Sequence, residues 1–140
     1  KTIVQRSKLF FFSLATALLV ASSYSLEAKA ESADNWLSQA VGSYPGQIWS
    51  GGVLIPAETE FLRNNDNSLI GSYSMQGQGL GVLSQCQAIK KLVARCIWND
   101  RYGSGDLEVT FSENFSSFKG FWTPKGLTEK LPWNGKRQGT

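Results

Sequence analysis

The sequence predicts a mainly β fold, a small antiparallel up-and-down (meander) β-barrel of seven or eight strands that is closed or partly open. Three observations support this expectation. Apolar and polar side chains alternate with a period of two, as in Leu107, Val109 and Phe111, turn residues separate these runs, and aromatic residues recur 24 or 25 positions apart. Short antiparallel strands that follow one another along the chain lose their exposed edges when they close into a barrel.

Residues 1–30 are interpreted as a cleavable signal peptide. Basic residues among the first eight precede an apolar run from Leu9 to Ala21, and Ala28-Lys29-Ala30 fits the small-x-small pattern of a cleavage site. The apolar run has 13 residues, fewer than the ~20 that a helix needs to span a bilayer. We therefore expect export to the periplasm or to the exterior, with no membrane span in the mature protein.

The basic character of the chain belongs to this N-terminal segment. Residues 1–30 hold four of the 14 Lys and Arg residues and one of the 11 Asp and Glu residues, so the rest of the chain carries ten of each and is neutral. A neutral surface gives no electrostatic reason to bind nucleic acid, and we expect none as a partner. The expected partners are a small ligand or an envelope or secreted protein.

Residues 31–43 are expected to form a short helix and linker that cover one barrel end, with Asp34 as the helix cap. The barrel domain is expected to span residues 44–134, followed by a flexible tail at residues 135–140. Pro56 lacks an amide donor, so we expect it at an edge or a bulge. From the alternating runs and the turns between them, strands are expected near residues 44–49, 52–62, 68–76, 80–87, 92–99, 105–112 and 117–123, with an eighth near residues 131–133.

The aromatic spacing indicates one two-strand unit that is used repeatedly. Trp49, Tyr73, Trp98 and Trp122 are separated by 24, 25 and 24 residues. We expect all four rings to point into the barrel, where a glycine two positions earlier leaves room, as Gly71 does before Tyr73. Rings of this size either fill the interior or leave space for one modest ligand, and the sequence leaves both alternatives open.

Cys86 and Cys96 are expected to form a disulfide. They flank residues 88–92, the expected turn of a hairpin, so their Cβ atoms face one another across neighbouring strands. The pair lacks the C-x-x-C spacing of a redox-active site, and disulfides are common in exported proteins. A structural bond is therefore favoured over redox chemistry.

No catalytic residue, metal or cofactor is expected. The sequence contains no histidine, which removes the commonest general base. Glu58 and Glu60 point to the same side of one strand and are interpreted as a solvated outer face, because glycosidase carboxylates face each other across a cleft. Asp100 and Asp106 bracket a glycine-containing loop, but it lacks the alternating acids of a calcium site. Residues 99–105 are interpreted as a turn in which Asp100 accepts backbone hydrogen bonds.

Trp36, Phe121 and Trp133 are the candidate ligand-binding residues. Trp36 and Trp133 stand outside the aromatic spacing, and alternation places Phe121 opposite the inward Trp122, so all three are expected on an exposed surface. The sequence favours an exported, non-catalytic barrel that binds an apolar small molecule, a glycan or a protein partner. The alternatives are a scaffold with a filled interior that acts only through its surface, and a carboxylate-dependent hydrolase.

Overall fold

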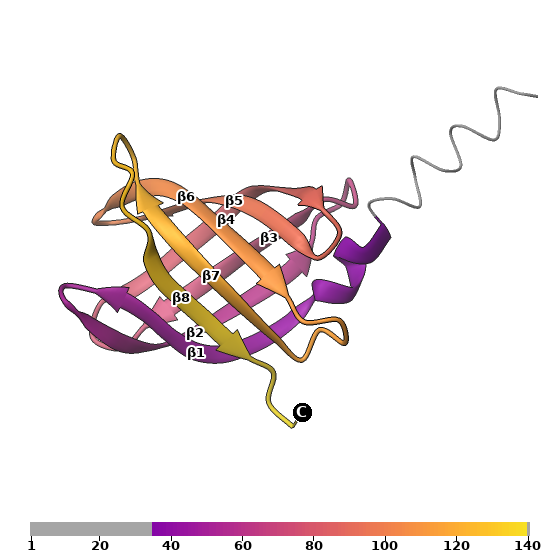
Figure 1. The fold of residues 1–140 in the computed structure, drawn as a ribbon, viewed down its shortest axis with the longest axis horizontal. Coiled ribbons are helices and arrows are strands. Elements are labelled where there is room, and N and C mark those ends of the chain that lie inside the picture. The colour runs from indigo at the N-terminus through magenta and orange to yellow at the C-terminus, as the bar shows by residue number, and fades with distance from the viewer. Residues whose placement is uncertain (1–34, 140) are drawn as a thin grey trace, which may run out of the picture.

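The computed structural model describes residues 35–139, which form one short helix and eight strands (Figure 1). The 3₁₀ helix η1 (Asn35–Ala40) precedes strands that each pair antiparallel with the next one along the chain. The strands are β1 (Gly42–Ser50), β2 (Val53–Arg63), β3 (Leu69–Met75), β4 (Gly79–Lys90), β5 (Val93–Asp100), β6 (Gly103–Phe111), β7 (Ser117–Pro124) and β8 (Leu131–Lys136). The predicted strands, including the eighth, are confirmed. The predicted signal peptide, residues 1–30, lies outside the described residues.

The sheet closes on itself, because β8 pairs with β1 as well as with β7. The closing ladder runs from Gly46 opposite Gly135 to Ile48 opposite Trp133. The predicted meander barrel is therefore confirmed, and it is closed rather than partly open. Pro56 pairs with β1 one residue before the β2–β3 ladder begins at Ala57, and its carbonyl accepts the Gln76 N–H at 3.0 Å, so it lies at the very end of that ladder.

The two ends of the barrel differ (Figure 1). At one end, which we call the plugged end, η1 lies beside the connections β2–β3, β4–β5 and β6–β7. The opposite end, which we call the mouth, carries the connections β1–β2, β3–β4, β5–β6 and β7–β8, at residues 51–52, 76–78, 101–102 and 125–130. Among residues 35–139, a helix therefore covers the plugged end, and the mouth carries turns alone.

Aromatic rings fill the interior at the plugged end. Four inward side chains pack edge to face or tilted, with ring centroids 5.4 to 5.9 Å apart; they are Tyr44, Phe61, Phe111 and Phe118. Trp36 of η1 covers this cluster, 6.0 Å from the ring of Phe111. The indole of Trp36 is only 7% exposed, so the expectation that it lies on an exposed surface is wrong. Its ring is buried because it packs on the apolar end of the cluster.

The C-terminal segment is held against η1. Strand β8 continues through Lys136, and Arg137 Nη2 donates to the carbonyl oxygens of Gln39 and Val41, both at 2.8 Å. It also donates to the Tyr44 hydroxyl at 2.9 Å. The expected flexible tail at residues 135–140 is therefore wrong for residues 135–137, since the strand and these hydrogen bonds order them.

Three of the four regularly spaced rings point inward, and one does not. Tyr73 and Trp98 are buried, and Trp122 is half-buried against the core. The expectation that Trp49 points inward is wrong, because its neighbour Ile48 occupies the inward position of β1 and alternation places Trp49 on the outer face.

The predicted disulfide between Cys86 and Cys96 is confirmed. It joins β4 to β5 with the two Cα atoms 4.0 Å apart, and both side chains are buried. The register of the two strands shifts between Ser84 and Gln87, a bulge that brings Cys86 opposite Cys96. The bond therefore ties one hairpin from inside the barrel.

Replacing both cysteines by alanine is expected to lower the free energy of unfolding by about 2–3 kcal/mol, because closing a short loop restricts the unfolded chain. Urea denaturation of the oxidised protein and of the double variant measures this difference. The variant should be insensitive to reductant, which serves as the control. Equal denaturation midpoints for the two proteins would contradict the expectation.

Candidate functional site

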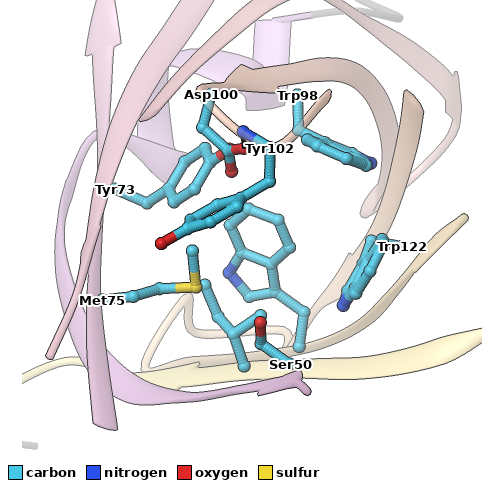
Figure 2. Close-up of a pocket in the computed structure, with 9 residues that line it drawn as sticks. Ser50, Tyr73, Met75, Trp98, Asp100, Tyr102 and Trp122 are labelled. Carbon is cyan, nitrogen blue, oxygen red and sulfur yellow. Dashed lines mark hydrogen bonds between the residues drawn. The ribbon is translucent and has the colours of Figure 1, made fainter. Parts of the chain in front are cut away.

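The mouth of the barrel contains a small open pocket with a volume of about 50 Å³ (Figure 2). Side chains from β1, β3, β5, β7 and β8 line it, together with one residue of the β5–β6 turn. Small-molecule pockets that enclose a whole ligand typically measure about 300–1,000 Å³. The pocket therefore has room for a group of a few atoms, and among the described residues the ring cluster fills the plugged end of the interior.

Aromatic rings dominate the pocket wall. Trp98 and Trp122 meet almost at a right angle, with centroids 5.1 Å apart and an interplanar angle of 84°. Tyr73 and Trp133 form a second edge-to-face pair at 4.7 Å. Figure 2 shows Tyr73 on one side of the pocket and Trp98 and Trp122 on the other, with Tyr102 between them in this view. The wall therefore presents several ring surfaces to the same small space.

Two glycines make this crowding possible. A Cβ on Gly81 would come within 2.1 Å of the Tyr73 ring, and one on Gly105 would come within 2.8 Å of the Trp98 indole nitrogen. Both glycines belong to strands next to the ring that they accommodate. The missing Cβ atoms thus let each ring lie close to a neighbouring backbone.

Each indole N–H of the pocket tryptophans is already bonded. Trp98 Nε1 donates to the Thr123 carbonyl at 3.3 Å, and Trp122 Nε1 donates to the carbonyl of Trp49 at 2.9 Å. Trp133 Nε1 donates to the Thr59 hydroxyl at 2.9 Å, which satisfies both of these buried polar groups. The tryptophans therefore offer the pocket ring surface rather than hydrogen-bond donors.

Asp100 supplies the acidic group of the pocket wall. Its Oδ2 accepts the Tyr73 hydroxyl proton at 2.7 Å, and its Oδ1 accepts the backbone N–H of Tyr102 at 2.8 Å. The second bond confirms the interpretation of Asp100 as a turn residue. Burial of Tyr73, together with its hydrogen bond to Asp100 and the negative charge of that carboxylate, raises the pKa of the Tyr73 hydroxyl well above its ordinary value.

The edge of the mouth carries both polar and apolar side chains. Tyr102 is 61% exposed, and Arg101 donates to its hydroxyl at 2.9 Å while the guanidinium lies 5.0 Å from the ring centroid. Ser50 donates its hydroxyl proton to Gln78 at 2.8 Å. Four exposed apolar residues, which we call the apolar rim, lie in or next to the mouth connections; they are Val53, Leu54, Leu80 and Leu127.

The three predicted ligand-binding residues are not brought together. Trp133 is only 2% exposed, so the expectation of an exposed side chain is wrong: alternation on β8 turns it inward, where it lines the pocket. Phe121 is half-buried on the outer face of β7, with the Lys130 ammonium 4.6 Å from its ring centroid, and borders a separate open hollow. Trp36 lies at the plugged end.

The predicted set missed Tyr73, Asp100 and Tyr102. The regular aromatic spacing already singled out Tyr73, Trp98 and Trp122, but as core residues. The helix expected before the first strand already indicated which barrel end is covered. The sequence did not show that the inward rings near the opposite end leave space between them for an open pocket.

The acidic residues considered from the sequence are dispersed. Glu58 and Glu60 are exposed on the outer face of β2, and Glu58 accepts a hydrogen bond from Ser43 at 2.6 Å. Asp106 is exposed, whereas Asp100 faces the pocket, so the two do not share one site. Within residues 35–139 no cluster of three or more metal-ligating side chains occurs, and no helix there is long and apolar enough to cross a bilayer.

Comparisons with protein-family models, with curated proteins and with solved structures find no match for this chain. The fold and site therefore define it as a closed meander barrel with a filled interior and an aromatic pocket at its mouth. The buried disulfide suggests a compartment outside the cytoplasm, where such bonds persist.

Replacing Thr59 by valine is expected to destabilise the protein by about 1–3 kcal/mol, because the buried Trp133 N–H then loses its acceptor. Thr59→Ser keeps the hydroxyl and is the matched control. Urea denaturation compares the two variants with the parent protein. A valine variant as stable as the serine variant would contradict the role assigned to this hydrogen bond.

The stability of the protein is expected to fall in alkaline solution. The pKa of Tyr73 is raised above the ordinary value of 10.0, chiefly by burial, so above about pH 10 the unfolded chain releases a proton that the folded protein retains. Below that pH the hydroxyl is neutral in both states and its contribution is unchanged. Urea denaturation from about pH 8 to about pH 11 measures the trend.

Tyr73→Phe removes this proton and should lose stability less steeply over the same pH range. The comparison of slopes isolates Tyr73 from Tyr44, whose pKa burial also raises and which is present in both proteins. Parallel losses of stability in the variant and the parent protein would refute the assignment.

Proposed function

We propose that this protein is an exported, non-catalytic binding domain that holds a small group of its ligand in the mouth pocket. The observation that carries the proposal is the convergence of five aromatic residues and one carboxylate on a single opening, opposite an end that a helix covers. Concave, mostly apolar sites with a few placed polar groups are where proteins bind small ligands.

The filled interior supports binding at the mouth rather than deep inside the barrel. The ring cluster around Phe61 and Phe111 occupies the plugged end, and the pocket volume of about 50 Å³ suits a terminal group. The remainder of such a ligand then lies across the mouth. Leu80 of the apolar rim is 78% exposed and provides apolar surface for that contact.

Export is supported by two independent features. The disulfide between Cys86 and Cys96 is of a kind that persists in oxidising compartments. The first 30 residues have the charge and hydropathy pattern of a signal peptide. Non-catalytic binding is supported by the pocket chemistry, since Asp100 is the only acid among the side chains that line it and the chain has no histidine.

A scaffold that acts through its surface is the second candidate. The exposed apolar rim favours it, because a partner protein could bury Leu54, Leu80 and Leu127 without entering the pocket. The two candidates differ in whether the pocket itself is occupied.

A fragment screen followed by ¹H–¹⁵N NMR tests the proposal, because each of the five tryptophans contributes one indole N–H signal. A fragment in the pocket is expected to shift the signals of Trp98, Trp122 and Trp133, which line it. Trp36 lies at the plugged end and serves as the internal control, so its signal should stay in place.

Fragments drawn from apolar molecules and saccharides cover the two small-ligand classes expected from the sequence, and small ammonium compounds add a cationic class. Shifts confined to Trp36, or no shift with any fragment, would contradict binding at the mouth. A partner protein that shifts rim signals and leaves the three pocket indoles unchanged would favour the scaffold.

A further inference from the structure

We infer that the group held in the mouth pocket is an alkylammonium cation, such as a methylated ammonium head group. This inference rests on the proposed function, since it names the ligand class of the same site. It follows from four properties of the pocket. The donors of its inner wall already have acceptors in the protein, aromatic rings form its wall, it carries one negative charge, and it is small.

Five side-chain donors of the pocket wall are already used by the protein, whereas the Tyr102 hydroxyl at the exposed edge accepts from Arg101 and keeps its own proton to donate. The indole N–H groups of Trp98, Trp122 and Trp133 donate to protein oxygens. The Tyr73 hydroxyl donates to Asp100, and the Ser50 hydroxyl donates to Gln78. An anion or a carbonyl group entering the pocket would therefore lose its hydration without gaining these donors, which is costly. A cation needs no donor.

The ring surfaces suit a cation. A ligand cation is attracted to the negative face of Trp or Tyr when it lies within about 6 Å of the ring centroid. Trp98 and Trp122 stand at 84° to one another and so form two walls of a corner, with Tyr73 across the pocket (Figure 2). The Met75 side chain adds a polarisable, uncharged contact. Several rings around one point are the arrangement that binds quaternary ammonium groups.

The charge of the pocket is also complementary. Asp100 is the only charged side chain that lines it, and each carboxylate oxygen has lone pairs beyond the one hydrogen bond that it accepts from Tyr73 or Tyr102. Arg101 remains at the edge, hydrogen-bonded to the Tyr102 hydroxyl. The Arg101 guanidinium therefore lies outside the pocket. The side chains that line the pocket include no cation beside the negative Asp100 carboxylate.

The volume excludes larger head groups. About 50 Å³ accepts a compact group of a few heavy atoms whose outer atoms remain at the opening. A sugar ring is larger, and its hydroxyls need several acceptors and donors together, whereas the inner wall of this pocket offers the Asp100 carboxylate and ring surface. A neutral apolar group of the same shape is the closest competitor, so the decisive comparison varies charge at constant shape.

Titration with choline and with 3,3-dimethyl-1-butanol makes that comparison, because the second compound replaces the ammonium nitrogen by carbon. Binding is followed by the indole N–H signals of Trp98 and Trp122 and by tryptophan fluorescence. Choline is expected to bind roughly 5- to 10-fold more tightly, the ratio that a cation over aromatic rings beside a carboxylate typically produces.

Asp100→Asn is expected to lower choline affinity about fivefold and to leave the affinity for 3,3-dimethyl-1-butanol unchanged. Glu58→Gln, which removes an exposed acid from the outer face of β2, is the matched control and should change neither affinity. If Asp100→Asn does not fold, Tyr102→Leu replaces it. That residue is largely exposed, and leucine keeps apolar bulk while removing the ring.

Equal affinity for the two compounds would overturn the inference and leave the proposed mouth site standing as a neutral apolar pocket. Binding of saccharide or apolar fragments without choline would overturn it in the same way. If no fragment shifts the pocket indoles, the proposed function fails together with the inference. An equal loss of both affinities in Asp100→Asn would show that Asp100 only maintains the shape of the pocket, which also overturns the inference.

Discussion

Closure of the sheet is the constraint on which the rest of the structure depends. When β8 pairs with β1, eight strands enclose an interior that is just wide enough for side chains. The inward rings around Tyr44 and Phe111 fill that interior at one end, and η1 covers them. The uncovered end is thereby the place where inward side chains of the described barrel meet solvent.

The polar groups near the mouth mainly form hydrogen bonds that stabilise the barrel, and few of them remain for the pocket. Hydrogen bonds from Trp98 to Thr123 and from Trp122 to Trp49 tie ring to backbone across the mouth end of the barrel. Because these donors are occupied, the inner wall of the pocket presents ring faces and one carboxylate. Satisfying the buried polar groups of the barrel thus limits the chemistry that its mouth can offer.

The disulfide and two glycines also help the chain to fit many aromatic rings into a narrow interior. Cys86 and Cys96 occupy inward positions without the bulk of a ring, and their bond fixes the β4–β5 hairpin. Gly81 and Gly105 remove the Cβ atoms that would strike Tyr73 and Trp98. Small side chains beside large ones are what allow a narrow barrel to hold so many aromatic residues.

Alternation, turns and the cysteine pair are local properties of neighbouring residues, so the sequence alone determined the strands, their meander order and the disulfide. The side of the strand that a ring occupies depends on register, and a shift of one residue exchanges the two faces. That is why Trp49 turned outward and Trp133 inward against expectation. The meeting of Tyr73 with Asp100, 27 residues apart, likewise required the closed barrel to bring β3 and the end of β5 to one mouth.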